Sequence, residues 1–185
     1  QEIIEAITPF MEENRYRNQT SFEVRVKDDH FYWIDATQRG GQPSTSSQLK
    51  LWKNFPQIVL AGAHGYLVDP EPAAEFSIEC MVKSKCDGQT WDLADIDDEL
   101  KPWLQLSYCC EVDGVVAYPP NDTHPGECGW LVAIGDSPHE VLDRAKELAD
   151  MLPDGLDANI ENLTGLIAEI EEANQEEAVC ESKIE

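Results

Sequence analysis

The sequence predicts a mixed α+β fold, in which a helix, a β-hairpin and a second helix precede a small, mostly antiparallel β-domain with a covering helix. Apolar and polar residues alternate over residues 20–26 and 31–37, which predicts two strands joined by a short turn. Further strand-like apolar runs follow between residues 75 and 135, and a capped helical pattern begins at residue 138. With 185 residues, the chain is long enough to bury a sizeable core.

Helices are expected on both sides of the hairpin. Residues 3–14 place apolar side chains at helical spacing with glutamates on the other side, despite Pro9 within the segment. After a loop rich in glycine, proline and serine at residues 38–47, one helix is expected to run to the AGAHG segment at residues 61–65. The apolar positions of this second helix are Leu49, Leu51, Trp52, Phe55, Ile58 and Val59.

The hairpin brings polar side chains toward one place. Alternation puts Glu23 and Arg25 on one face of the first strand, and Asp35 and Thr37 on one face at the end of the second strand. Antiparallel pairing of the two strands can therefore bring these four side chains together.

The β-domain is predicted from apolar runs separated by turn-forming residues. The expected strands cover residues 75–84, 103–112, 114–119 and 128–135. The acidic stretch at residues 87–100 is expected to be a loop. Ser137 and Glu140 form a capping box, so a helix over residues 138–152 should cover the sheet. The predicted core consists of Phe22, Val24, Ile34, Trp52, Phe55, Val132, Ile134, Leu142 and Leu148.

Charge and cysteine content restrict the partners and the compartment. The 13 basic and 37 acidic side chains give a net charge of −24, which repels nucleic acid and anionic membrane surfaces. No apolar stretch is long enough for a membrane span, and the first residues lack a signal-peptide pattern. The six cysteines include no C-x-x-C pair, which favours reduced thiols in a cytoplasmic protein over a zinc site or a disulfide scaffold.

The polar end of the hairpin has the residue types of a metal–phosphate site. Two carboxylates that converge from neighbouring strands, Glu23 and Asp35, can hold Mg²⁺, which takes oxygen ligands. Thr37 supplies a further oxygen, and Arg39 supplies a planar fork for phosphate oxygens. The adjacent glycine pair at residues 40–41 lets the backbone approach a ligand. The alternative is that both carboxylates are solvated and that Arg39 pairs with Asp35 on the surface.

The segment Asp35-Ala36-Thr37-Gln38-Arg39-Gly40-Gly41-Gln42-Pro43 resembles a motif of the ATP-grasp ligases, E-x-N-x-R-x-G-x-P. Within that family, it is most similar to the C-terminal half of the phosphoribosylamine–glycine ligases. Glu23 stands twelve residues before Asp35, where the family carries its first metal carboxylate. Aspartate replaces the motif glutamate and Thr37 replaces its asparagine, as in a divergent relative of phage or metagenomic type.

The resemblance implies ATP as a ligand and Mg²⁺, or Mn²⁺, as the metal. It implies Glu23, Asp35 and Thr37 as metal ligands, and Arg39 as the catalytic group on the transferring phosphate. Residues expected to contact the nucleotide are Arg25, Thr37, Arg39, Gly40 and Gly41.

The resemblance also divides the chain. Residues 1–66 correspond to the C-terminal part of the ATP-grasp nucleotide- and metal-binding domain, and residues 67–155 to a small β-rich C-terminal domain. An amphipathic helix at residues 156–173 and an acidic flexible tail at residues 174–185 complete the predicted organisation. The phosphate-binding lysines and the glycine-rich loop of the family lie N-terminal to this region, which implies the N-terminal remainder of an ATP-grasp protein as a partner.

The implied function is part of an ATP-dependent carboxylate–amine ligase of the purine-biosynthesis type, acting through an acyl phosphate on a small carboxylate and an amine. The isolated chain is then expected to be inactive. The alternative is a non-catalytic α+β domain derived from the ATP-grasp fold, with a role in assembly or regulation.

Overall fold

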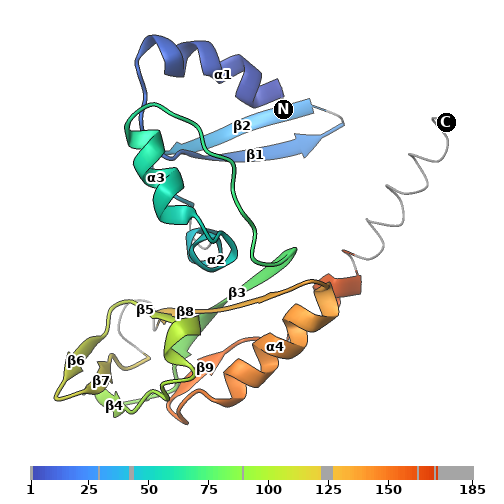
Figure 1. Ribbon diagram of the computed structural model, residues 1–185. Helices are drawn as coiled ribbons and strands as arrows, with labels where there is room; N and C mark the ends of the chain where they lie inside the picture. The colour runs from blue at the N-terminus through green and yellow to red at the C-terminus, as the bar shows by residue number, and fades with distance from the viewer. Residues whose placement is uncertain are drawn as a thin grey trace.

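The computed structural model describes residues 2–28, 30–41, 44–88, 90–121, 127–161, 163–168 and 170. The N-terminal part is a helix, a hairpin and two short helices (Figure 1). Its elements are α1 (Glu2–Glu13), β1 (Ser21–Lys27), β2 (His30–Thr37), α2 (Ser44–Leu51) and α3 (Phe55–Ala63). Each strand of the hairpin pairs only with the other, so this sheet has two strands.

The remainder forms the β-domain, whose strands all pair antiparallel in two sheets. The four-stranded sheet has the order β5-β8-β3-β9, and the three-stranded sheet has the order β4-β7-β6. The strands are β3 (Phe76–Ser84), β4 (Asp92–Ala94), β5 (Leu104–Leu106), β6 (Cys110–Val112), β7 (Val115–Tyr118), β8 (Glu127–Gly135) and β9 (Leu156–Ala158). A 3-10 turn, Lys101–Trp103, precedes β5, and helix α4 (Pro138–Asp150) follows β8.

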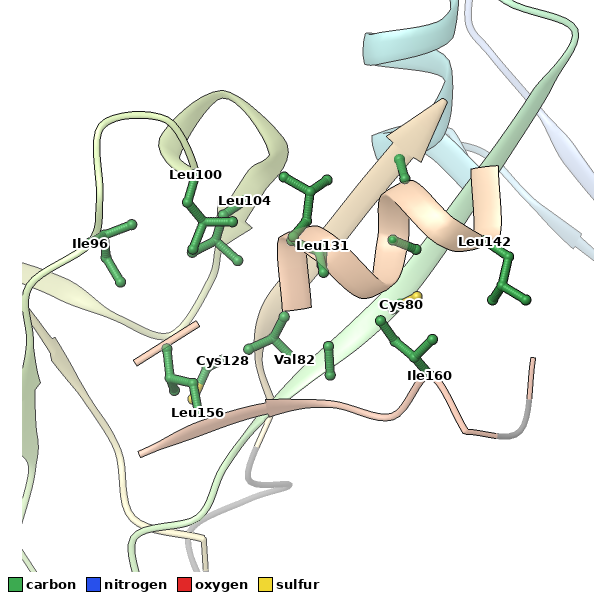
Figure 2. Close-up of a cluster of buried hydrophobic side chains, with 14 of the residues drawn as sticks. Cys80, Val82, Ile96, Leu100, Leu104, Cys128, Leu131, Leu142, Leu156 and Ile160 are labelled. Atoms are coloured by element: carbon green, nitrogen blue, oxygen red, sulfur yellow. The ribbon is translucent and has the colours of Figure 1, made fainter. Parts of the chain in front are cut away.

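The buried apolar core lies in the β-domain. Helix α4 packs against β8 and β3 through an apolar stripe that includes Leu142 and Leu148. These side chains join residues from several strands in one cluster, shown in Figure 2. The helix begins as the capping box predicts, because the Ser137 side chain accepts a hydrogen bond from the Glu140 backbone N–H at 3.1 Å.

The N-terminal part has no comparable core. Along the described residues, the first buried apolar side chain is Cys80, in β3. The hairpin and α1 leave large apolar side chains in solvent; these are Ile4, Phe10, Val26, Phe31, Tyr32, Trp33 and Ile34. A two-stranded hairpin needs a further packed layer for stability, and α1 covers only part of it.

The α+β class, the hairpin and the helix after residue 138 are confirmed. The single helix expected after the Gly/Pro/Ser-rich loop is wrong, because the chain breaks between α2 and α3. Pro56 lacks the N–H needed to continue α2, and Asn54 instead hydrogen-bonds the loop at Asp69 and Glu71. None of the described helices is long and apolar enough to cross a lipid bilayer.

Three further secondary-structure predictions need correction. The run at residues 103–112 forms two strands, because Tyr108 adopts a positive φ of 60° that interrupts the extended backbone. The stretch expected to be a loop at residues 87–100 contains β4, and β9 follows α4. Both are short strands formed by pairing with neighbours rather than by a local pattern.

Of the predicted core residues, Val132, Leu142 and Leu148 are buried. Phe22, Val24, Trp52, Phe55 and Ile134 are half-buried. The prediction that Ile34 belongs to the core is wrong, because its side chain is 54% exposed. The helix predicted at residues 156–173 is wrong over its first residues, because Leu156–Ala158 pair with β3 as strand β9. Residues 163–168 are helical, and the predicted tail lies outside the described residues.

One carboxylate of β3 contacts the start of α2. Glu79 Oε2 accepts hydrogen bonds from the Ser47 backbone N–H at 2.9 Å and from the Ser47 hydroxyl at 3.2 Å. The N–H groups of the first helical turn have no partner within the helix, so an acceptor here stabilises the helix start. Burial nevertheless raises the pKa of Glu79, because desolvation outweighs the hydrogen bonds from Ser47 and Ser46.

This raised pKa predicts a pH dependence of stability. Glu79 binds its proton more tightly in the folded state than in the unfolded state, so its contribution is most favourable at low pH and is lost as pH rises through the folded pKa. Urea unfolding of wild type and Glu79→Gln between pH 4 and pH 8 measures this contribution. The stability of wild type relative to the variant should fall as pH rises; a difference that rises with pH would contradict the assignment.

Candidate metal and nucleotide site

The hairpin register places the two predicted metal carboxylates directly opposite each other. Glu23 in β1 pairs with Asp35 in β2. Directly opposed residues of an antiparallel pair project from the same face, with Cβ atoms about 5 Å apart. Both side chains are exposed to solvent. Two oxygen donors are thus available to one hard cation that keeps water or phosphate oxygens as its other ligands.

A β-bulge lies immediately beside this pair. The register shifts after Glu23, so that Val24 pairs with Trp33 and Ile34 has no partner in β1. A bulge adds local twist and re-aims neighbouring side chains, and bulges are frequent next to functional sites. The extra residue interrupts the alternation from which the burial of Ile34 was predicted, and Phe31, Tyr32 and Trp33 of the same strand are exposed as well.

Arg25 forms an ion pair with one of the two carboxylates. Its guanidinium nitrogen lies 3.1 Å from Glu23 Oε1, and the two side chains are 74% and 53% exposed. An ion pair this exposed contributes little to stability. It does place a cation beside the carboxylate pair.

Thr37 lies next to Asp35 on the same strand face. Its hydroxyl is 3.5 Å from Asp35 Oδ2, which is a long contact. The side chain can therefore rotate its oxygen toward a cation held by the carboxylate without losing a strong hydrogen bond. The structure does bring together the four side chains Glu23, Arg25, Asp35 and Thr37.

Arg39 and the glycines form the loop that leaves β2. The Arg39 guanidinium donates to the Gly40 carbonyl at 2.8 Å, and the Arg39 carbonyl accepts from the Ser21 hydroxyl at 3.3 Å. The surface pairing of Arg39 with Asp35, the alternative to a metal–phosphate site, does not occur among the ion pairs of the described residues. The guanidinium uses one N–H donor on Gly40 and carries further N–H donors.

Gly40 is required by packing against α2. A Cβ at this position would overlap the hydroxyl oxygen of Thr45. That hydroxyl in turn donates to the Gly41 carbonyl at 2.6 Å. The glycine pair thus fits the loop against the helix start, a reason that the motif alone does not reveal. Gln42 and Pro43, the end of the motif, lie outside the described residues.

Polar contacts from the segment before β1 support this loop and were not foreseen from the sequence. The Asn18 amide donates to the Gln38 carbonyl at 2.9 Å. The Gln19 amide donates to Gln48 Oε1, also at 2.9 Å, and so connects the segment to α2. These residues lie far apart in sequence, and no local pattern signals their pairing.

The described residues contain no group of three or more His, Cys, Asp and Glu side chains arranged to hold a metal ion. The carboxylate pair alone offers only part of a cation's oxygen ligands, and a cation there would need further oxygens from a bound ligand. Such a site suits a cation that arrives with a polyphosphate.

The fold of this chain is similar to part of several solved structures that have the ATP-grasp fold. The crystal structure of phosphoribosylamine–glycine ligase from Thermotoga maritima matches at a TM-score of 0.61 and 19% identity, over 75% of this chain and 35% of that chain. Biotin carboxylase of Campylobacter jejuni, in a β-γ-ATP complex, matches at a TM-score of 0.55 and 15% identity, over 89% of this chain and 38% of that chain. The biotin carboxylase domain of a single-chain bacterial carboxylase matches at a TM-score of 0.53 and 18% identity, over 89% of this chain and 40% of that chain.

The chain therefore spans less than half the length of each of these structures. No family model and no curated protein sequence matches it. At these identities the likeness establishes the fold, which is an α+β part of an ATP-grasp architecture.

Proposed function

We propose that this chain is the C-terminal portion of an ATP-dependent carboxylate–amine ligase and that its hairpin supplies the Mg²⁺ and ATP-phosphate ligands. The observation that carries the proposal is the register of Glu23 opposite Asp35 within an ATP-grasp fold. The partial match of this chain to a phosphoribosylamine–glycine ligase supports a similar reaction, in which a small carboxylate and an amine are joined.

In the proposed reaction, the groups at the end of the hairpin hold the metal and the phosphates of ATP. The carboxylate substrate attacks the terminal phosphorus of ATP, the bond to ADP breaks, and an acyl phosphate forms. The amine then attacks the acyl carbon and loses a proton, and inorganic phosphate leaves and can take up that proton. When Mg²⁺ is bound, it would neutralise part of the negative charge on the phosphates.

Each residue has a distinct part in this proposal. Glu23 and Asp35 hold the cation, and Thr37 adds an oxygen beside Asp35. Arg39 turns from the Gly40 carbonyl to the transferring phosphate, where a planar cation stabilises developing charge. Arg25 shields the Glu23 carboxylate and attracts the anionic nucleotide to a chain whose net charge is −24.

The exposed apolar surface of the N-terminal part supports the proposal that another part of the protein packs on it. A groove between α1 and the hairpin is lined by Ile3, Ala6, Ile7, Phe10 and Trp33. Clustered exposed apolar side chains of this kind indicate an interaction surface. We assign it to the N-terminal remainder of the ATP-grasp protein, which would also bring the adenine- and phosphate-binding groups.

The isolated 185-residue chain should consequently show no ATPase or ligase turnover and at most weak nucleotide affinity. It holds one end of the nucleotide site, and its net negative charge disfavours approach of ATP. Phosphate release by the purified chain, with ATP and Mg²⁺, measures this directly. The control is a Glu23→Ala, Asp35→Ala double variant, and turnover well above that control would contradict the prediction.

The proposed activity itself is tested on the full-length protein, or on this chain combined with its N-terminal half. ATP and Mg²⁺ are supplied with candidate carboxylates and amines, and ADP formation is measured. Dependence of ADP formation on both substrates supports the ligase. A stable complex that binds neither ATP nor Mg²⁺ would instead assign the chain an assembly role.

A further inference from the structure

Two cysteine side chains meet between the sheets of the β-domain, far along the chain from the hairpin. Cys128 lies in β8 and is fully buried, whereas Cys109 lies between β5 and β6 and is half-buried. The Cys109 thiol lies 3.5 Å from the Cys128 carbonyl oxygen and 3.4 Å from the Ser107 carbonyl oxygen. These contacts place the Cys109 sulfur against residue 128, and the interaction between the two thiols raises the pKa of Cys109 and lowers that of Cys128.

The backbone around the pair fixes this approach. The Ser107 N–H donates to the Cys128 carbonyl at 2.8 Å, which extends the pairing of β5 with β8. At Gly129 a Cβ would overlap the Gln105 carbonyl, so the two strands pass unusually close together. Tyr108 has a φ of 60°, a left-handed conformation that is strained for a non-glycine residue and that recurs at functional sites.

We propose that Cys109 and Cys128 are a redox-active pair that closes to a disulfide when the protein meets a small-molecule disulfide such as oxidised glutathione. The net reaction converts two protein thiols and one glutathione disulfide into one protein disulfide and two molecules of reduced glutathione. No metal or further oxidant takes part.

Accessibility and hydrogen bonding set the order of the two steps. Cys109 is the half-buried thiol of the pair, and the hydrogen bond to Cys128 together with burial raises its pKa. It therefore attacks one glutathione sulfur as its proton passes to the Cys128 sulfur; the other glutathione leaves as a thiolate and takes up that proton. Cys128 then attacks the Cys109 sulfur as a thiolate and displaces the second glutathione. The contact with Cys109 and the Ser84 backbone N–H lower the pKa of Cys128 despite its burial, which suits a resolving nucleophile.

The other described cysteines are poorly placed for this chemistry. Cys80 is buried in β3, where desolvation raises its pKa to about 11. The Cys86 thiol is directed to the Thr90 carbonyl at 4.0 Å. Cys110 is exposed and follows Cys109 directly, so its side chain points to the other side of the chain. It therefore serves as a matched control.

The disulfide would tie β8 to the segment that leads into the three-stranded sheet. Because β6 and β7 lie between the two cysteines, the bond closes a loop around both strands. A closed loop of this length restricts the unfolded chain, and we expect Tm to rise by roughly 5 °C on oxidation.

The test is native oxidation of the whole chain with oxidised glutathione, followed by alkylation, digestion and mass spectrometry. We expect a Cys109–Cys128 link within one molecule, alkylated Cys80 and a raised Tm. Cys110→Ser should keep the link and the Tm shift, and Cys109→Ser should lose both. Because Cys109→Ser alters only the half-buried partner, it remains informative if Cys128→Ser fails to fold.

Three results would overturn the assignment. These are a link through Cys110 instead of Cys109, disulfides formed only between molecules, and a Cys109–Cys128 pair that stays reduced at a glutathione disulfide excess that modifies Cys110.

Discussion

Asp35→Asn should lower ATP turnover of the full-length protein by about two to four orders of magnitude, the range for loss of a main electrostatic stabiliser and its metal. The amide keeps the size of the side chain and removes the negative charge that faces Glu23 across the hairpin. Asp35 is exposed, so the Tm of the ligand-free protein should stay the same or rise slightly as like-charge repulsion disappears. The stabilisation that Mg²⁺ and ATP give to wild type should vanish.

Steady-state phosphate release and thermal unfolding with and without Mg²⁺-ATP measure these effects. Glu111→Gln is the matched control, because Glu111 is also an exposed carboxylate on a short antiparallel strand, β6, outside the hairpin. It should leave turnover unchanged. If Asp35→Asn lowered the ligand-free Tm by several degrees and left turnover intact, Asp35 would be a structural residue and the ligase interpretation of the hairpin would be wrong.

Leu148→Ala should destabilise the isolated chain by about 3 kcal/mol, within the range for truncating a fully buried leucine. Leu148 is 0% exposed and lies on the face of α4 that packs against β8 and β3. The surrounding sheet cannot collapse fully into the space, so a cavity adds to the lost apolar burial. Urea unfolding monitored by circular dichroism gives the free energy.

Ile34→Ala is the companion variant because it removes a similar side chain from the hairpin. Ile34 is 54% exposed, so the isolated chain should lose less than about 0.5 kcal/mol. In the full-length protein the same substitution should cost more, since the proposed N-terminal remainder would cover the hairpin. Equal, small costs in both proteins would contradict a packed layer over this surface.

Local patterns were enough to predict the parts of the fold that depend on local forces. Alternation over the hairpin gave both strands and put Glu23 and Asp35 in position to meet, which the register confirms. The capping box at Ser137 marked the start of α4. In each case, neighbouring residues in sequence carry the interaction that forms the element.

The errors arose where distant residues decide the structure. The bulge at Ile34 interrupts the alternation of apolar and polar residues along β2. In addition, the apolar character of a strand does not reveal whether a second layer covers it. Strand β9 forms beside β3, where the Lys85 N–H donates to the Gly155 carbonyl at 2.8 Å. The break before Pro56 depends on Asn54 contacts with a loop fifteen or more residues away.

The candidate site was predicted in composition but not in its supporting contacts. The ion pair of Arg25 with Glu23 and the turn of Arg39 toward Gly40 depend on side-chain rotamers that no sequence pattern specifies. The support from Asn18 and Gln19 likewise needs the three-dimensional arrangement.

The most direct test of the proposed site is paramagnetic broadening of amide NMR signals in the full-length protein, labelled with ¹⁵N and bound to Mn²⁺ and a non-hydrolysable ATP analogue. Because Mn²⁺ broadens the signals of nearby nuclei, the amides at residues 22–24 and 34–37 should disappear first, and Asp35→Asn should restore them. Broadening confined to the acidic stretch at residues 92–99, with the hairpin signals unchanged, would contradict a metal site at Glu23 and Asp35.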